Sequence, residues 1–362
     1  MALQVEKKIA VINNFHPFTG LGKYALNLFL EMRKKNNAEM LYLETKDNRL
    51  NNVFRGIKKI RQEFSFPFWN KTLSWYYYFP PRIPDGYSLY HCTSQYLGKI
   101  ARFRKPAIIS HFDIAPLVFP EEYPFHLRFF LKKALSFYRE AEKIHISSEK
   151  RREEVINLGI NEEKIVFVPA GIDEKVFFPA EKEKARKNLG LPLNKKIILN
   201  VGSEEARKNI PVLLEAVKEL QKNYSGLLLA RIGSKNQKYD EIKKNINILH
   251  FSNIPEEKLR LFYSAADLLV FPTLYEGFGY PALEAMACGC PVITTEEMSV
   301  FADGCILVEK NNGEQIIQEA EKLLENEKLR KKYSKKAIQL SKNFSMKKTA
   351  EKMLQLYDSV RA

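Results

Sequence analysis

Residues 271–293 constrain the fold of this chain more than any other stretch. The apolar run at 266–272 ends in a proline, which is typical of a buried parallel strand that runs into a loop. Pro281 suits the first position of a helix, where its missing N–H leaves no bond unmade. Gly289 can end that helix, and residues 292–295 predict a further strand. The order strand, glycine turn, helix, strand predicts a parallel α/β sheet.

Two carboxylates, Glu276 and Glu284, stand on either side of the glycine turn and the predicted start of the helix. A helix start carries backbone N–H groups without partners inside the helix, and such groups bind phosphates and sugar hydroxyls. A lone pair of glutamates at this spacing is more often a pair of solvated charges. The run Glu-Gly-Phe-Gly that begins at Glu276 and the tail Ala-x-Gly-x-Pro-Val-Ile after Glu284 favour a binding site instead.

This pattern resembles the Glu-x7-Glu motif of the retaining glycosyltransferases of family 4, and the similarity extends over nearly the whole chain. The resemblance implies the GT-B fold, with two Rossmann-like doubly wound α/β domains that face each other across a cleft. It implies that Glu284 accepts hydrogen bonds from ribose hydroxyls. It places Glu276 against the hydroxyls of the donor sugar, with the amides of Gly277, Phe278 and Gly279 nearby.

The resemblance also implies a reaction. A hexosyl group would pass from a UDP- or GDP-sugar to a hydroxyl of a glycan or lipid-linked glycan, with retention and without a metal or other cofactor. Mannose from a GDP donor and glucose or its N-acetyl form from a UDP donor are both compatible with the sequence. Two rival functions are a nucleotide-sugar epimerase on the same fold and a non-catalytic basic protein that binds nucleic acid.

Strand-like and helix-like segments alternate through both halves of the chain, which predicts helices on both faces of two parallel sheets. We expect an N-terminal acceptor-side domain over residues 1–175 and a nucleotide-sugar-binding domain over 176–344. The last helix, 345–362, resembles the terminal helix of the family, which packs back onto the first domain. The predicted strands are 8–13, 39–43, 89–93, 107–111, 143–147 and 165–169, followed by 196–201, 227–232, 246–251, 266–272 and 292–295.

Arg207 and Lys208 follow the predicted strand 196–201 and Gly202. A guanidinium group can bind two phosphate oxygens at once, and an ammonium group adds a point charge. A departing nucleoside diphosphate gains negative charge, so cations held beside it stabilise the transition state more than the ground state. A solvated surface pair is the alternative. The segment resembles the diphosphate-binding motif of the family, so we expect Gly202, Arg207 and Lys208 to bind the donor and the two cations to act in catalysis with Glu276.

Gly20 and Gly22 follow the first strand, in a turn that resembles Gly-Gly-Ile-Gly-Arg-Tyr of the family with Thr19 in place of the first glycine. Glycines at these positions would let the backbone approach the donor closely. Two glycines at this spacing are weak evidence by themselves, so their assignment as donor-binding residues depends on the resemblance.

His111 ends a predicted strand, and the segment around it resembles the His-Asp loop of the family. The family has the two residues adjacent, whereas Phe112 separates His111 from Asp113 here. Either His111 takes the family position, or Phe112 does and His111 caps its own strand. We adopt the first interpretation, in which His111 is catalytic and lies near the donor sugar.

The chain carries a formal net charge of +15, with basic clusters in its first half at 55–61, 102–105 and 128–133. An anionic membrane surface, nucleic acid and simple solvated faces are all compatible with such clusters. No nucleic-acid motif is present, so no nucleic acid is expected. The aromatic segment 64–81 is either an acceptor- or membrane-contacting surface or a packed excursion.

Cellular location is predicted from what the sequence lacks. Its four cysteines are too scattered for a disulfide framework. No charge-free run is long enough to span a membrane, and no secretory signal is visible. We therefore expect a cytoplasmic protein, in peripheral contact with the inner face of the membrane if the basic surface binds lipid.

Overall fold

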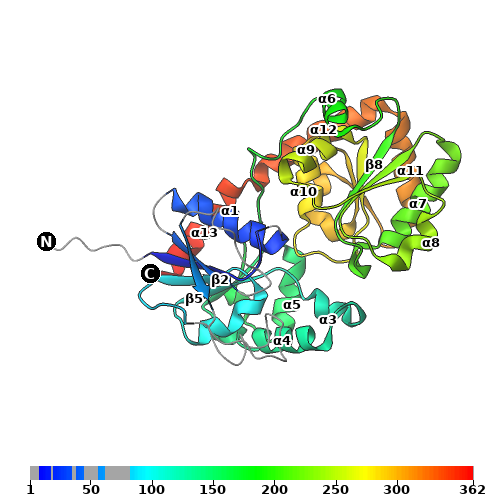
Figure 1. Cartoon of the computed structure of the whole chain (residues 1–362). Coiled ribbons are helices and arrows are strands. Elements are labelled where there is room, and N and C mark those ends of the chain that lie inside the picture. Colours follow the sequence, from blue (N-terminus) through cyan, green and yellow to red (C-terminus); the bar gives the residue numbers. More distant parts are fainter. Residues whose placement is uncertain (1–7, 18, 35–37, 45–55, 62–81, 362) are drawn as a thin grey trace. The chain divides into compact units, whose positions relative to one another are not determined.

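The computed structural model describes residues 8–17, 19–34, 38–44, 56–61 and 82–361. The chain forms two compact units (Figure 1). The N-terminal unit comprises residues 1–171 with the C-terminal helix from Met346, and the C-terminal unit comprises Ile172–Ser345. The division falls at Ile172 rather than at the predicted residue 175 because Ile172 pairs with Ser345 and donates its N–H to the Phe344 carbonyl at 2.9 Å.

The N-terminal sheet has seven parallel strands in the order β3-β2-β1-β4-β5-β6-β7. Strands β1, β4 and β5 are buried along their whole length, as the apolar runs predicted. The edge strand β3 was not predicted, because its two lysines hide the apolar residues between which they lie. The bounds are β1 Ile9–Asn13, β2 Ala38–Glu44, β3 Ile57–Arg61, β4 Leu89–Cys92, β5 Ala107–His111, β6 Lys143–Ile146 and β7 Ile165–Phe167.

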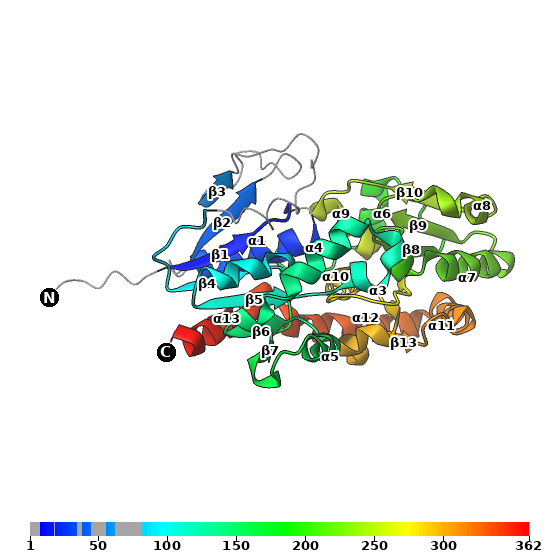
Figure 2. The ribbon, with the colours of Figure 1, turned by 90° about the horizontal axis from the view of Figure 1, so that it is seen from below.

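Helices cover this sheet, and the last helix of the chain is one of them. Helix α13 (Met346–Arg361) packs against α1 (Gly20–Arg33) and β4, and Figures 1 and 2 show the red end of the ribbon beside these elements. The Thr349 hydroxyl donates to the Pro169 carbonyl at 3.0 Å. Further helical elements of this unit include η1 Gln95–Arg102, α3 Ala115–Val118, α4 Phe125–Leu135 and α5 Arg152–Asn157.

A chain of polar side chains crosses the buried centre of the N-terminal sheet. Ser110 lies between His91 and His145, at 2.7 and 2.8 Å, and Tyr357 of α13 contacts the other ring nitrogen of His91 at 2.6 Å. His145 also contacts the Val168 carbonyl at 2.8 Å. Burial lowers the pKa of His145 to about 4 and holds the pKa of His91 well below its ordinary value, so both rings are neutral.

The C-terminal sheet has six parallel strands in the order β10-β9-β8-β11-β12-β13. The chain reverses its direction of progress across the sheet between β8 and β11. In open α/β sheets, ligands bind outside the carboxyl ends of the two strands that flank such a point. The bounds are β8 Ile197–Val201, β9 Leu228–Ile232, β10 Ile248–Phe251, β11 Leu268–Phe271, β12 Val292–Thr295 and β13 Ile306–Val308.

Amphipathic helices pack on both faces of this sheet. Helix α7 buries one apolar stripe that includes Leu213, Leu214, Val217 and Leu220, at the spacing of an α-helix. Helix α12 packs against α10 and η8, and α11 packs against α7. The bounds are α6 Lys182–Leu189, η6 Ala206–Lys208, α7 Ile210–Asn223, α8 Asp240–Lys243, α9 Glu256–Ala265, α10 Tyr280–Ala287, η8 Glu296–Gly304, α11 Gly313–Glu325 and α12 Glu327–Ser341.

The structure bears on two further sequence predictions, one for the aromatic segment and the basic cluster and one for membrane-spanning helices. The aromatic segment 64–81 and Arg55 of the first basic cluster lie outside the described residues. Among the helices that the structure describes, none combines the length and apolar character needed to cross a bilayer.

Candidate active site

The loop after β8 holds Arg207 and Lys208 at the carboxyl edge of the sheet. Gly202 follows β8 with φ of 139°, a conformation open to glycine but strained for other residues. The two cations lie on η6, and Asn209 follows them in the left-handed region with φ of 53°, which asparagine tolerates. Asn209 occupies the N-cap position of α7, but its side chain donates to Asn311 at 3.1 Å instead of capping the helix.

The loop after β11 holds Glu276 beside the same edge. Gly279 ends this loop with φ of 94°, immediately before α10. A methyl group at this position would lie 2.2 Å from Sδ of Met298, so both the backbone and the space around it require glycine. Pro281 stands in the first turn of α10, where the sequence predicted it.

The structure brings Arg207, Lys208 and Glu276 together in one cluster. Lys208 forms an ion pair with Oε1 of Glu276, and Nη1 of Arg207 lies 3.2 Å from Oε2. The Thr273 hydroxyl donates to Oε1 of Glu276 at 3.0 Å. Lys208 Nζ also lies 5.1 Å from the centre of the Phe271 ring. Glu276 and Lys208 are 7% and 8% exposed, so their charges interact with little screening by solvent.

Backbone hydrogen bonds tie the two loops to each other. The Arg207 carbonyl accepts the N–H of Leu274 at 2.7 Å and the Thr273 hydroxyl at 3.0 Å. The relative position of the cations and the carboxylate is therefore fixed by main-chain contacts as well as by the ion pairs.

The charges of the cluster determine its protonation. Burial acts to raise the pKa of Glu276, but Lys208 and Arg207 outweigh it, and the pKa lies below its ordinary value. Burial lowers the pKa of Lys208, and the nearby Arg207 adds to the effect while Glu276 opposes it. The Arg207 guanidinium also donates to Glu205 at 2.7 Å. Two carboxylates thus neutralise the two cations in this structure.

A second ion pair supports the cluster, and the sequence did not reveal it. The N–H of Glu276 donates to Oε1 of Glu297 at 3.3 Å, and Lys310 donates to Oε2 of Glu297 at 2.9 Å. Glu297 is buried, whereas its neighbour Glu296 is exposed. Two adjacent glutamates after an apolar strand give no sign of which one turns inward, so only the fold identifies Glu297.

Glu284 lies on α10 and is buried. The Tyr263 hydroxyl from α9 donates to Oε2 of Glu284 at 2.8 Å. Burial, together with the charge of Glu284, holds the pKa of Tyr263 well above its ordinary value, so the hydroxyl remains a donor. The expected contact between Glu284 and a ribose stays a prediction, and Tyr263 is a partner that the sequence did not indicate.

The Phe278 side chain anchors the glycine turn in an aromatic cluster. Its ring centre lies 5.5 Å from that of Phe301, 5.4 Å from that of Tyr280 and 6.2 Å from that of Phe344. The backbone of Gly277, Phe278 and Gly279 therefore stands on a packed base. Its predicted contact with the donor sugar stays a prediction.

The turn that contains Gly20 and Gly22 begins α1 in the N-terminal unit. The Thr19 hydroxyl caps the helix by accepting the N–H of Gly22 at 3.1 Å. A methyl group on Gly22 would lie 2.0 Å from the His16 carbonyl oxygen, so close packing of the preceding loop requires this glycine. Gly20 is exposed at the first helical position. A role for either residue in donor binding stays a prediction.

His111 is fully buried inside the N-terminal unit. Its Nδ1 lies 3.0 Å from the Tyr138 hydroxyl, and its Nε2 lies 3.4 Å from a carboxylate oxygen of Glu154. Phe112 has its ring 4.9 Å from that of Tyr24 on α1. Because the imidazole has no exposed surface in this structure, the predicted contact with a donor sugar would require the His111 loop to rearrange.

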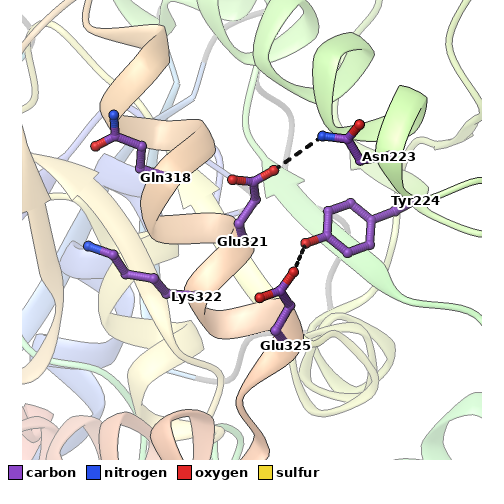
Figure 3. A pocket seen from close by; sticks show the side chains of 6 residues that line it. All are labelled: Asn223, Tyr224, Gln318, Glu321, Lys322 and Glu325. Carbon is purple, nitrogen blue, oxygen red and sulfur yellow. Dashed lines mark hydrogen bonds between the residues drawn. The ribbon is translucent and has the colours of Figure 1, made fainter.

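A separate pocket of about 550 Å³ lies between the carboxyl end of α7 and α11 (Figure 3). The Tyr224 hydroxyl donates to Glu325 at 2.6 Å across it, and Asn223 donates to Glu321 at 3.5 Å. Lys208 precedes the opposite end of α7, roughly 20 Å away along the helix. This pocket is therefore distinct from the Glu276 cluster.

Within the described residues, no group of three or more His, Cys, Asp and Glu side chains is placed to hold a metal ion. The four cysteines are buried, and none of them forms a disulfide.

The sequence of the C-terminal unit matches a known protein family. Residues 181–340 match the family model described as glycosyl transferases group 1. The matched range contains Arg207, Lys208, Glu276 and Glu284, and it spans most of Ile172–Ser345. The C-terminal unit is therefore similar to the glycosyl transferases group 1 family over most of its length.

Individual relatives match this chain over different lengths. A D-inositol 3-phosphate glycosyltransferase of Mycolicibacterium smegmatis is 31% identical over 42% of this chain and 37% of that protein. Three relatives of this kind are matched over only 32–52% of their own length. The O-antigen chain mannosyltransferase B of Escherichia coli is 24% identical over 94% of this chain and 96% of that protein.

Solved structures confirm the predicted fold. HepE of Anabaena, solved in complex with UDP-glucose, superposes with a TM-score of 0.75 at 16% identity, over 98% of this chain and 100% of that one. Similarity at this identity shows the fold alone. The chain therefore has the GT-B fold, built from two parallel-sheet α/β units.

Proposed function

We propose that this protein is a retaining glycosyltransferase that moves a hexosyl group from a UDP- or GDP-sugar to a hydroxyl of a glycan or lipid-linked glycan. The observation that carries the proposal is the buried cluster of Arg207, Lys208 and Glu276 at the switch point of the C-terminal sheet. The group 1 family match over the same unit supports it. So do a relative named as a mannosyltransferase and a fold neighbour solved with UDP-glucose.

Binding of a nucleotide sugar would exchange the partners of the two cations. A diphosphate brings negative charge that competes with Glu276 and Glu205 for Arg207 and Lys208. As the cations turn to the phosphates, the Glu276 carboxylate gains capacity to accept hydrogen bonds from sugar hydroxyls. The cluster thus holds the cations in a defined place and avoids leaving buried charges unpaired.

The same cations would assist the bond-breaking step. Negative charge on the leaving diphosphate increases as the bond between the sugar and the phosphate breaks. Arg207 and Lys208 therefore stabilise the transition state more than they stabilise the bound donor in the ground state. The amino end of α10 adds partial positive charge from its backbone N–H groups. This fixed positive charge supports a reaction without a divalent metal.

Retention is proposed to occur by attack on the face that the leaving group departs from. The leaving phosphate oxygen would accept the proton of the acceptor hydroxyl, so the protein need not supply a nucleophilic carboxylate. Glu276 is a poor candidate for such a nucleophile in this structure, because Lys208, Arg207 and Thr273 already contact its two oxygens.

Partners and location follow from this reaction. The donor is the nucleotide sugar, and the acceptor is a glycan or lipid-linked glycan. A cytoplasmic location with peripheral contact at an anionic membrane is part of the proposal, and nucleic acid is not an expected partner.

The experiment is a transfer assay on the whole chain. The protein is incubated with a panel of UDP- and GDP-sugars and a pool of glycan and lipid-linked acceptors, and products are detected by a mass increase of one hexosyl unit. The anomeric configuration of the product is then read by NMR, and the assay is repeated with a chelator. Glu309→Gln, an exposed carboxylate outside the cluster, is the control for Glu276→Gln.

The outcomes separate the candidate functions. A hexosylated product with the anomeric configuration of the donor, unaffected by the chelator and lost in Glu276→Gln, supports the proposal. An epimerised nucleotide sugar without any glycosylated product would favour the epimerase. Salt-sensitive binding to RNA or duplex DNA with no affinity for nucleotide sugars would favour the nucleic-acid-binding alternative.

A further inference from the structure

Arg231 is the largest fully buried side chain that the structure describes. It lies near the carboxyl end of β9, which pairs with β8 in the C-terminal sheet (Figure 2). Burial lowers the pKa of Arg231 to about 10 and the charge of Glu204 opposes this effect, so the guanidinium is protonated at neutral pH. Burying a charge is costly, so the contacts of this side chain have to account for its presence.

The Arg231 guanidinium ties the ends of two neighbouring strands together. Its Nη1 donates to the Gly202 carbonyl at 2.7 Å and to the Ile232 carbonyl at 2.9 Å. The N–H of Gly202 donates to the same Ile232 carbonyl at 2.9 Å. Gly202 is the first residue of the loop that carries the two cations of the candidate site. Arg231 therefore fixes the point at which this loop leaves the sheet.

Glu204, two residues further along the loop, is held by a second set of contacts. Its Oε2 accepts the N–H of Asn236 at 2.5 Å and a hydrogen bond from Lys243 Nζ at 2.8 Å. Nε of Arg231 lies 3.8 Å from Oε1 of Glu204. Glu204 is 3% exposed, so these charges interact with little screening by solvent. The loop after β8 is thus gripped at two successive positions from the β9 side of the sheet.

The gripped part of the loop contacts the Glu276 cluster. A methyl group on Gly202 would lie 3.7 Å from Cε of Lys208, which is van der Waals distance. The far end of the loop is bonded through the Arg207 carbonyl to residues 273–274. The two cations therefore lie between an anchor at the start of the loop, made by Arg231, and an anchor at its end.

A second buried arginine of the same unit shows a complete set of structural contacts. Arg186 is 4% exposed. Its Nε donates to the Ala265 carbonyl at 2.9 Å, its Nη1 to carbonyls in the segment 192–195, and its Nη2 to Asp267 at 3.0 Å. Asp267 also accepts the N–H of Ile197 at 2.8 Å, where β8 begins. This ion pair therefore lies at the amino edge of the sheet, at the opposite end of β8 from the candidate site.

The contacts of Arg231 are incomplete by comparison. No residue that the structure describes accepts a hydrogen bond from its Nε or Nη2, and the same holds for donors to Oε1 of Glu204. Buried polar groups without partners lower stability, and such exceptions are concentrated at functional sites. The position of the loop, rather than the stability of the fold, accounts for a guanidinium at this place.

We infer that Arg231 is a positioning residue for glycosyl transfer, which holds the loop 202–208 so that Arg207 and Lys208 meet the diphosphate of the donor. A displacement of about 1 Å at a distance from the reacting atoms can lower a rate about 100-fold. The effect on the reaction rests on the proposed function, whereas the effect on the loop can be measured without any substrate.

The test combines amide hydrogen exchange with transfer kinetics on the full chain. Arg231→Met removes the anchor. Arg231→Met/Glu204→Gln also removes the carboxylate that faces the lost cation, and it replaces the single variant if that one does not fold. Arg186→Met is the matched control, because it takes a buried guanidinium from a buried carboxylate at the other edge of the same sheet. Urea unfolding of all variants measures the loss of stability that they share.

In both Arg231 variants, exchange of the amides 202–209 should rise about tenfold. The turnover number kcat should fall about 100-fold, and KM for the donor should change less, because misplaced cations lose more contact with the transition state than with the bound donor. Arg186→Met should keep the exchange of 202–209 and the kcat of the parent chain, although its unfolding midpoint also falls.

Parent-like exchange of 202–209 in a folded Arg231 variant would overturn the inference. An equal rise in Arg186→Met would overturn it too, because the effect would then follow stability rather than position. Full kcat in a variant whose loop exchanges faster would show that the anchor does not serve the reaction. A parent chain that transfers no sugar contradicts the proposed function instead, and the exchange pattern then decides by itself whether Arg231 holds the loop.

Discussion

Replacement of Lys208 by methionine tests how much of the stability of the C-terminal unit depends on the buried charge cluster. Removing one partner of a buried ion pair costs about 3–5 kcal/mol, because the remaining charge is left uncompensated. Glu276 keeps its contacts with Arg207 at 3.2 Å and with Thr273 at 3.0 Å, which offset part of this cost. We therefore expect Lys208→Met to lower the free energy of unfolding by about 2–3 kcal/mol.

A second variant shows whether the loss comes from the stranded carboxylate. In Lys208→Met/Glu276→Gln the buried negative charge is gone, so the stability loss should be smaller than the sum of the two single losses by about 2 kcal/mol. The assay is urea unfolding followed by circular dichroism at pH 7, with Lys310→Met as a related variant that leaves the Lys208 pair in place.

The pH dependence of Lys208→Met follows from the same reasoning. With its main cation removed, burial raises the pKa of Glu276 in the folded state above that in the unfolded state. A carboxyl with a raised folded pKa destabilises the protein as pH rises above the unfolded value, so the defect of Lys208→Met should be smaller at pH 5 than at pH 8. A coupling between the two sites below about 0.5 kcal/mol, or a defect that does not depend on pH, would refute the argument.

Three further predictions concern residues around the site and in the core. Glu297→Gln should reduce glycosyl transfer at least tenfold while leaving the fold intact, because the backbone N–H of Glu276 and the Lys310 ammonium group both lose a charged partner. The control Glu296→Gln should have no effect in the same kinetic assay. Gly279→Ala should destabilise the C-terminal unit by about 2–3 kcal/mol, because the φ of 94° and the close approach of Met298 Sδ both oppose a Cβ atom. The measurement is thermal unfolding, and a melting temperature equal to that of the parent chain would show that the turn relaxes without strain. His145 has a pKa of about 4 in the folded protein, below the ordinary value of about 6.5, so the N-terminal unit should lose stability as the pH falls between these two values. The total loss in the free energy of unfolding should be about 3 kcal/mol. Urea unfolding with equal midpoints at pH 7 and pH 4.5 would contradict this prediction.

The sequence predicted the framework of the fold because the buried strands are continuous apolar runs. Strands β1, β5, β8 and β11 lie where such runs end in glycine, proline or polar residues. Strand β13 was not predicted, because a run of three residues, Ile306–Val308, is too short to show a periodicity. The strand order and the switch between β8 and β11 depend on contacts between distant segments, which the local pattern does not contain.

The sequence identified the charged residues of the candidate site but not the residues that support them. Arg207, Lys208 and Glu276 were identified from two separate motifs, and the structure shows that they form one cluster. The supporting residues Glu297 and Tyr263 were missed, because a buried charge or hydroxyl looks like a surface residue until its partners are known.

For His111, the sequence predicted the position in the chain but not the orientation of the side chain. The position at the end of β5 was predicted, but one inserted residue changes which side of a strand each side chain faces. In the structure, His111 contacts Tyr138 and Glu154, while Phe112 contacts Tyr24. Sequence pattern alone left both orientations open, and packing of the surrounding helices determines which one is adopted.

Calorimetric titration with UDP and GDP tests most directly whether Arg207 and Lys208 exchange Glu276 for a diphosphate. The parent chain should bind one of the two nucleotides. Arg207→Gln/Lys208→Met should abolish that binding, and Glu276→Gln should strengthen it because the carboxylate no longer competes for the cations. Binding of equal strength in all three proteins, or no binding of either nucleotide by the parent chain, would contradict the account.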